Sequence, residues 1–242
     1  LVCTPCTPMF PVLNDKKEII GILTAQDVIE AVDDEMGEDY AKLAGLTAEE
    51  DLRETTKESM KKRLPWLIIL LLLGMGVSTV VGSFEAVVAV IPIVICFQSL
   101  ILDMAGNVGT QSLAVTIRVL MDDELNAKAK LRLVLKEMKV GFCNGLGLFL
   151  GGLAFVFLGL YIFGLKGYAL TMAFLVSGCV GVSLLLAMVI SSLVGTLVPL
   201  FFAKIKIDPA VASGPLITTV NDLVAVVTYY GLAWLFLIPI MG

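Results

Sequence analysis

The sequence predicts an all-α polytopic membrane protein with five transmembrane helices per chain, preceded by a partial α/β segment and a connecting helix. Of its 242 residues, 58% are hydrophobic, and the mean hydropathy is +0.95. Soluble domains are about half apolar. Five apolar stretches are each long enough to cross a hydrocarbon core of about 30 Å at about 1.5 Å per residue. This composition argues against nucleic acid as a partner.

The chain divides by composition into a first segment (1–36), an acidic connecting helix (37–63) and a transmembrane domain (64–242). In the first segment, the β-type runs 11–13 and 19–23 are separated by a turn-forming Asn-Asp pair, which predicts a hairpin. Thr24 and Asp27 then have the spacing of a capping box that opens a helix.

The cysteine and histidine content argues against transition-metal chemistry. Cys3 and Cys6 form a single C-x-x-C pair, and the chain has no His at all. Without a second pair or a His, this falls short of a zinc site, so we interpret the pair as incidental.

The connecting segment is rich in acidic residues, including Glu38 and Asp39, and ends with Lys61, Lys62 and Arg63. One interpretation is a solvated helix face, which is the usual role of such charge runs. The other is a low-affinity sensor of divalent cations, in which carboxylates repel one another until an ion bridges them.

The predicted spans are 65–82, 86–120, 140–163, 168–203 and 208–240, with a charged amphipathic connection at 122–139. Loops on the side of Lys61 hold seven further basic residues, whereas the loops on the other side hold only Lys166. Cytoplasmic loops carry this excess, so the N-terminus is predicted inside the cytoplasmic membrane and Gly242 outside. An odd number of spans with one polar path per chain also suggests a pore built by two copies.

The last span carries the main candidate residue, Asp222. Its nearest basic residue in sequence is Lys206, sixteen positions back. An ionised Asp at the bilayer centre costs about 2.5 to 3.5 kcal/mol on insertion scales, so such a residue usually faces a partner or a watery path. The alternative is that Asp222 pairs with Arg118 of another span and only locks the bundle.

The neighbours of Asp222 offer oxygen ligands. Thr218 lies one turn before it on the same face, and Asn221 is adjacent. Pro215 has no N–H, which is expected to leave the carbonyl of Val211 without its helical donor. Oxygens suit hard cations such as Mg²⁺, which tends to keep its waters and to contact carboxylates through them.

A second polar group interrupts the second span. Gly106 and Gly109 permit close helix approach or local unwinding, while Asn107, Thr110 and Gln111 offer oxygens at membrane depth. These side chains are either cation ligands or polar contacts between neighbouring helices, and the sequence leaves both open.

The first segment, with its Pro-Val, turn and Ile-x-Gly-Ile-Leu-Thr-x-x-Asp order, resembles the second half of a cystathionine-β-synthase (CBS) domain. In many such domains the residues matching Thr24 and Asp27 contact a nucleotide, although helix capping alone explains both residues. Half a domain does not complete a nucleotide pocket, and we expect a further segment upstream.

The spans resemble the MgtE family of magnesium channels. The resemblance rests on Ala-Gly-Asn-Val-Gly-Thr-Gln-Ser at 105–112, Leu-Lys-Glu-Met-Lys-Val-Gly at 135–141, Asp-Pro-Ala at 208–210, Gly214-Pro215 and Asn221-Asp222. The family pattern has Gly-Gly-Asn where this chain has Ala-Gly-Asn. The resemblance implies a homodimer with a Mg²⁺ pore along its two-fold axis, a central Asp at Asp222, and closure by Mg²⁺ bound among acidic residues of the CBS region and the connecting helix.

We therefore predict a Mg²⁺-selective channel or transporter of the cytoplasmic membrane, with no catalysed reaction and with lipid around it. The predicted cation ligands are Asp222, Thr218, Asn221, Val211, Asn107, Glu38 and Asp39. The alternatives are a transporter for another divalent cation, such as Co²⁺ or Ca²⁺, and a non-conducting, membrane-anchored CBS signalling module.

Overall fold

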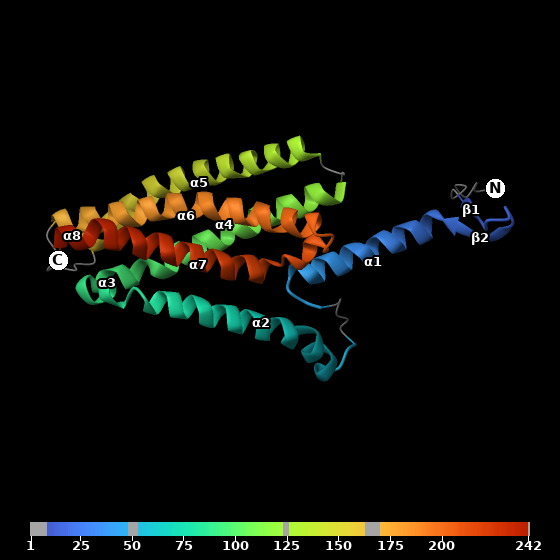
Figure 1. The fold of residues 1–242 in the computed structure, drawn as a ribbon, viewed down its shortest axis with the longest axis horizontal. Helices are drawn as coiled ribbons and strands as arrows, with labels where there is room; N and C mark the ends of the chain where they lie inside the picture. The colour runs from blue at the N-terminus through green and yellow to red at the C-terminus, as the bar shows by residue number, and fades with distance from the viewer. Residues whose placement is uncertain (1–8, 48–52, 123–125, 163–169, 242) are drawn as a thin grey trace.

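The computed structural model describes residues 9–47, 53–122, 126–162 and 170–241. Long helices form a bundle, and α1 reaches away from it toward the hairpin β1–β2 (Figure 1). The elements in order are β1 (Met9–Leu13), β2 (Ile19–Thr24), α1 (Ala25–Leu43), α2 (Thr56–Gly82), α3 (Glu85–Val90), η1 (Pro92–Val94), α4 (Ile95–Asp122), α5 (Ala127–Ile162), α6 (Leu170–Lys204), η2 (Pro209–Val211), α7 (Gly214–Leu232), η3 (Ala233–Leu237) and α8 (Ile238–Met241).

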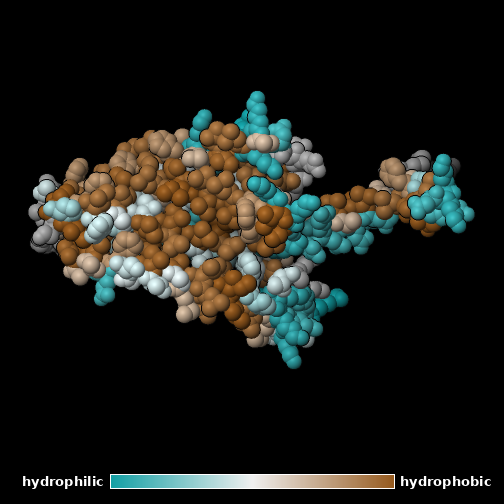
Figure 2. Space-filling model, viewed as in Figure 1, coloured by the Kyte–Doolittle hydropathy of each residue, from teal (hydrophilic) through white to brown (hydrophobic). Residues whose placement is uncertain are grey.

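Five helices are long and apolar enough to cross a membrane, which confirms the predicted fold class. They are Thr56–Gly82, Pro92–Leu120, Ala127–Gly159, Thr171–Lys204 and Gly214–Ile240. Hydrophobic residues cover most of the bundle, and hydrophilic residues gather at the end from which α1 leaves (Figure 2). The chain is therefore a multi-pass membrane protein.

The predicted hairpin and capping box are both confirmed. Strands β1 and β2 pair antiparallel, with Met9 opposite Thr24. In the turn, Asn14 Oδ1 accepts hydrogen bonds from the backbone N–H groups of Lys16 and Glu18, both at 2.9 Å. At the start of α1, Asp27 N donates to Thr24 Oγ1 at 3.2 Å, and Thr24 N donates to Asp27 Oδ2 at 2.7 Å.

The range 37–63, predicted as one connecting helix, is divided in the structure between the end of α1, the segment that follows it and the beginning of α2. Helix α1 continues unbroken through Gly37 and ends at Leu43. Gly45, with φ of 84°, donates from its N–H to Lys42 O, and Leu46 N donates to Ala41 O. This Schellman motif needs the left-handed conformation that glycine adopts without strain, and it terminates α1.

A second capping box opens α2 before the membrane. Thr55 N and Thr55 Oγ1 donate to Glu58 Oε2 at 2.9 and 2.7 Å, so the helix begins at Thr56 rather than at the first apolar residue. The basic residues 61–63 therefore belong to the membrane-spanning helix itself. Among the residues described in α2 none is buried, in contrast to the other four spans.

The packed centre of the bundle is formed by α4, α6 and α7. Tyr229 and Tyr230 of α7 are buried, and their hydroxyls donate to Val94 O at 2.8 Å and to Gln98 Oε1 at 2.6 Å. The buried tyrosines thereby satisfy their polar ends where α7 passes the beginning of α4. Their hydrogen bonds fix the antiparallel arrangement of these two helices.

Small residues set the helix separations. A side-chain carbon on Gly195 of α6 would collide with the backbone of Gly109 in α4, and one on Gly145 of α5 would lie 3.1 Å from Leu185 Cα in α6. Close backbone approach at glycines is typical of membrane helix packing. Helix α4 is continuous through this region, so its glycines serve close approach and not unwinding.

Candidate functional site

The start of α7 is built by a serine cap and a proline. Ser213 Oγ accepts from Leu216 N at 3.4 Å, and Pro215 lies in the first turn, where its missing N–H is not needed. The expected orphan carbonyl of Val211 is not found. It belongs to the 3₁₀ turn η2 and accepts from Ser213 N at 2.7 Å, which leaves one lone pair of that oxygen for another ligand.

Two threonine hydroxyls face each other where α7 crosses α4. Thr110 Oγ1 lies 3.5 Å from Thr218 Oγ1. Thr110 Oγ1 donates to Gly106 O at 2.9 Å, and Thr218 Oγ1 donates to Gly214 O at 3.0 Å. Because each hydroxyl proton is engaged within its own helix, both oxygens present lone pairs to the space between them. Such a pair can accept from water or bind a hard cation.

Glycines on α4 allow this approach. A side-chain carbon on Gly106 would lie 2.9 Å from Thr218 Cγ2, and one on Gly109 would overlap the amide of Asn221. Both distances are shorter than ordinary van der Waals contact, so the close approach of α4 and α7 at this depth depends on glycine at these positions.

Asp222 follows Thr218 by one helical turn and is half-buried. In the described part of the chain it forms no ion pair, and the charge it interacts with is that of another acid, Asp103 on α4. Arg118 lies fifteen residues beyond Asp103, which is about 22 Å along the helix axis. The predicted alternative, a locking pair between Asp222 and Arg118, is therefore not formed.

Asp103 was not predicted as a site residue from the sequence. It stands on the second span, and the antiparallel packing of α4 against α7 brings its charge within electrostatic range of Asp222. Two carboxylates with like charge at membrane depth repel each other, and a cation between them relieves this repulsion.

The two predicted asparagines lie in different places. Asn221 is fully buried against α4, and neither its Nδ2 nor its Oδ1 has a hydrogen-bond partner among the described residues. Asn107 is exposed on α4, where it lines a cavity of about 510 Å³ together with Gln111 and Asn144. Asp222 is not among the residues that line this cavity.

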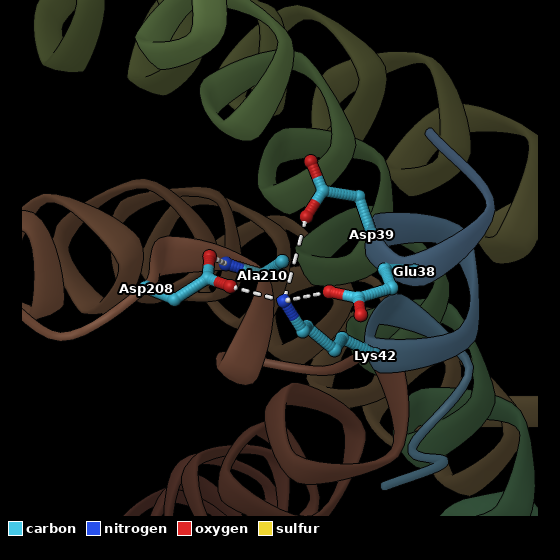
Figure 3. A network of polar contacts seen from close by, with 5 residues as sticks. All are labelled: Glu38, Asp39, Lys42, Asp208 and Ala210. Atoms are coloured by element: carbon cyan, nitrogen blue, oxygen red, sulfur yellow. Dashed lines mark hydrogen bonds and ion pairs between the residues drawn. The ribbon is translucent and has the colours of Figure 1, made fainter. Parts of the chain in front are cut away.

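The predicted regulatory acids Glu38 and Asp39 gather around one ammonium group at the end of α1 (Figure 3). Lys42 Nζ lies 2.8 Å from Asp208 Oδ2, 3.4 Å from Glu38 Oε2 and 3.9 Å from Asp39 Oδ1. Asp208 Oδ1 also accepts from Ala210 N at 2.9 Å. The cluster thus joins α1 to the turn η2 that precedes α7.

The groups in this cluster shift one another's pKa values in different directions. The hydrogen bond to Asp208 raises the pKa of Lys42. Burial raises the pKa of Asp208, but the hydrogen bonds from Lys42 and Ala210 outweigh it and bring that pKa below its usual value. Burial and the charge of Asp208 raise the pKa of Asp39. The described residues contain no group of three or more acids, cysteines or histidines arranged as a metal site, so Lys42 is the cation that this cluster holds here.

The C-terminal end of α1 also contacts the beginning of α7. A side-chain carbon on Gly45 would lie 2.7 Å from Trp66 Cδ1 and 3.3 Å from Pro215 Cγ. Trp66 Nε1 in turn donates to Ser213 Oγ at 3.0 Å. The connecting segment, the first span and the N-terminus of α7 therefore meet at one point.

A sequence model of the MgtE family, described as a divalent cation transporter, matches residues 98–232, which is more than half of the chain. The chain belongs to the MgtE family. The match covers α4 to α7, the helices that carry Asp103, Thr110, Thr218 and Asp222. The predicted resemblance is thereby confirmed.

Curated relatives agree with this assignment. The chain is similar to proteins named magnesium transporter MgtE from Enterococcus faecalis, at 39% identity over 229 residues, and from Bacillus subtilis, at 36% over 229 residues. It is also similar to the protein of that name from Thermus thermophilus, at 32% over 232 residues. These matches cover 94% to 95% of this chain and 48% to 49% of each relative, so the chain spans about half their length.

Some predicted features fall outside the described residues. They are the Cys3–Cys6 pair and Lys166. Thr24 and Asp27 lie in the capping box of α1, where they bond to each other.

Proposed function

We propose that the chain forms the membrane-spanning part of a Mg²⁺ channel or transporter. The observation that carries the proposal is Asp222, a half-buried acid of a membrane span whose charged neighbour is a second acid, Asp103. Two like charges at this depth are stabilised when a cation passes between them. The relatives are named magnesium transporters, which supports Mg²⁺ as the transported ion.

In this proposal, hydrated Mg²⁺ is held by Asp222 and Asp103 through its waters, since Mg²⁺ loses its hydration shell reluctantly. Thr218 and Thr110 accept hydrogen bonds from those waters with the lone pairs that face each other. Asn107 and the remaining lone pair of Val211 serve the ion at other depths. Asn221 does not contact the ion in this proposal. Its buried amide sets the spacing of α7 and α4 and so positions Asp222.

We propose a homodimer with the path at its axis. Support comes from α2, of which no described residue is buried within one chain, and from the single set of acids per chain. A second copy would cover apolar surface and bring its own Asp222 to the path.

The proposed orientation puts α1 and the hairpin in the cytoplasm and the end of α8 outside. It follows from the excess of Lys and Arg at the end of the bundle where α1 lies. The exposed apolar side chains of the hairpin and of α1, among them Phe10, Ile20, Ile29 and Met36, support a CBS-type fragment that is covered by further protein.

Gating by cytosolic Mg²⁺ is proposed at the cluster of Glu38, Asp39 and Asp208. Mg²⁺ would compete with Lys42 for these carboxylates and hold α1 against η2 at high concentration. Because Gly45 lies so close to Pro215 that a side-chain carbon on it would be 3.3 Å from Pro215 Cγ, a displacement of α1 would reach the first turn of α7 directly.

The test is flux into vesicles that contain the purified chain and a Mg²⁺-sensitive dye. Uptake of Mg²⁺ that Co²⁺ and Ca²⁺ inhibit only weakly supports a magnesium pathway. Equal or stronger competition by Co²⁺ or Ca²⁺ would assign the chain to another divalent cation. Absence of flux for all three ions would support the non-conducting module.

A further inference from the structure

The N-terminal third of α5 carries a basic surface that the cation path does not use. Its exposed basic residues are Lys128, Arg132, Lys136 and Lys139, and a fifth basic residue, Lys130, is half-buried. Among the described residues none of the four makes an ion pair. With Leu131, Leu135 and Val140 they line a shallow groove of about 500 Å³. We call this set of seven residues the α5 basic groove.

The groove faces away from the bundle. Leu133 and Glu137 of the same helix are buried, and Glu137 Oε2 accepts a hydrogen bond from Ser112 Oγ of α4 at 3.1 Å. At about 100° per residue, the four basic residues lie between about 180° and 260° around the helix from Glu137. The one acid in this stretch is therefore turned inward and does not neutralise the groove.

The same face becomes apolar as α5 enters the membrane. Phe142, Leu146 and Leu150 lie at about 140° to 220° from Glu137 and are 48%, 42% and 61% exposed. Leu131 and Leu135, 59% and 50% exposed, extend this apolar face back among the basic residues. A face of this composition is the lipid-contacting face of a membrane helix.

Helix length puts the basic residues at the headgroup level. Helix α5 has 36 residues. At about 1.5 Å per residue it is about 54 Å long, so about 24 Å extends beyond a hydrocarbon core of about 30 Å. Lys128 to Lys139 cover about 16 Å of that extension. Their side chains can therefore reach phosphates while the leucines remain against acyl chains.

We propose that the α5 basic groove binds the headgroup of an anionic phospholipid, such as phosphatidylglycerol, in the leaflet that surrounds this end of the bundle. The four positive charges complement the phosphate, and Leu131 and Leu135 contact the first part of the acyl chains. A soluble anion would be attracted by the positive charges alone and would not use the contact with the two leucines. The inference concerns the outer face of the bundle and does not depend on conduction through Asp222.

The test measures lipid association with the purified chain in phosphatidylcholine vesicles that carry a trace of spin-labelled phosphatidylglycerol or spin-labelled phosphatidylcholine. The wild-type chain is expected to immobilise phosphatidylglycerol more strongly, by about threefold or more, and added salt is expected to reduce this preference. Equal association of the two lipids would overturn the proposal. This is also the result expected if an acidic protein segment, and not a lipid, occupies the groove.

The variant K128Q/R132Q/K136Q/K139Q is expected to lose the preference. Its matched control, K57Q/K61Q/K204Q/K206Q, removes four exposed positive charges elsewhere on the chain and is expected to retain it. An equal loss in both variants would show a general charge effect and overturn the assignment to α5. Because every substituted side chain is exposed, helix content by circular dichroism serves as the folding check.

Two further arms separate lipid from free phosphate. Inorganic phosphate, added as a competitor at constant ionic strength, is expected to leave the bound phosphatidylglycerol in place. The variant L131S/L135S keeps all four charges and is expected to weaken phosphatidylglycerol association, because a lipid needs the apolar contact. Displacement by phosphate together with full binding by L131S/L135S would assign the groove to a soluble anion instead.

Discussion

Thr218 Oγ1 lies 3.5 Å from Thr110 Oγ1, and each hydroxyl donates its proton to a carbonyl of its own helix. Two helices that are distant in sequence thus bring unoccupied lone pairs together one turn from Asp222. In the proposed path, these lone pairs accept hydrogen bonds from the waters of the passing cation.

The first prediction concerns this hydroxyl pair. Thr218→Val keeps the shape that packs against Gly106 but removes one of the facing oxygens. Mg²⁺ flux is expected to fall by about fivefold, as for the loss of one ordinary hydrogen bond to a water of the hydrated ion. The matched control is Thr219→Val, whose hydroxyl bonds Pro215 O at 2.9 Å within α7. Similar flux in both variants would remove Thr218 from the path.

The second prediction concerns the helix separation. Gly109→Ala places a methyl group where the Asn221 amide now lies, and the overlap is expected to cost about 1 to 3 kcal/mol. The melting temperature of the purified chain should fall, and Mg²⁺ flux should fall with it. Gly147→Ala in α5 is the control, since its added carbon meets nothing within 4 Å. An unchanged melting temperature for Gly109→Ala would contradict the close contact of α4 and α7.

The sequence predicted the membrane class, the number of spans, the hairpin and the first capping box, because all of these follow from local patterns. It did not predict that the charge of Asp103 acts on Asp222, because this depends on how α4 and α7 pair. Nor did it separate α1 from α2, since the acidic run continues across Gly45 while the Schellman motif ends the helix there. Val211 was expected in a helix interior, but a turn gives its carbonyl a donor.

The third prediction is a pH dependence of the contact between α1 and η2. The pKa of Asp208 is lowered from its ordinary value of 3.8, so the stabilisation from this carboxylate is present above that value. It is lost as pH falls through the lowered pKa. The pKa of Lys42 is raised from 10.5, so its contribution is present below that value and is lost as pH rises through the raised pKa.

Hydrogen exchange of the last turn of α1 measures this contact. Exchange is expected to be slow between these limits and faster on both sides. Asp208→Asn should accelerate exchange at neutral pH by about two- to fivefold, consistent with a partly exposed ion pair. Asp39→Asn should not accelerate it, because the raised pKa of Asp39 shows that its charge is disfavoured there. Exchange that is independent of pH and of Asp208 would rule out the contact.

The fourth prediction tests cation binding at the end of α1. Millimolar Mg²⁺ is expected to protect the segment between α1 and α2 from proteolysis, because the ion bridges carboxylates that otherwise repel. The double variant Glu38→Gln/Asp39→Asn should lose this protection. Asp33→Asn/Asp34→Asn removes the same charge from an exposed part of α1 and should retain it. Cleavage of the unaltered chain at the same rate with and without Mg²⁺ would rule out the regulatory role of this cluster.

The most direct test of the proposed path is Mg²⁺ flux through Asp222→Asn in vesicles, compared with the unaltered chain and with Glu85→Gln, an exposed acid of α3. The amide keeps the size of the side chain and removes the charge that a cation needs. We predict that Asp222→Asn lowers Mg²⁺ flux to the level of empty vesicles and that Glu85→Gln retains full flux. Undiminished Mg²⁺ flux through Asp222→Asn, at equal amounts of inserted protein, would contradict the account.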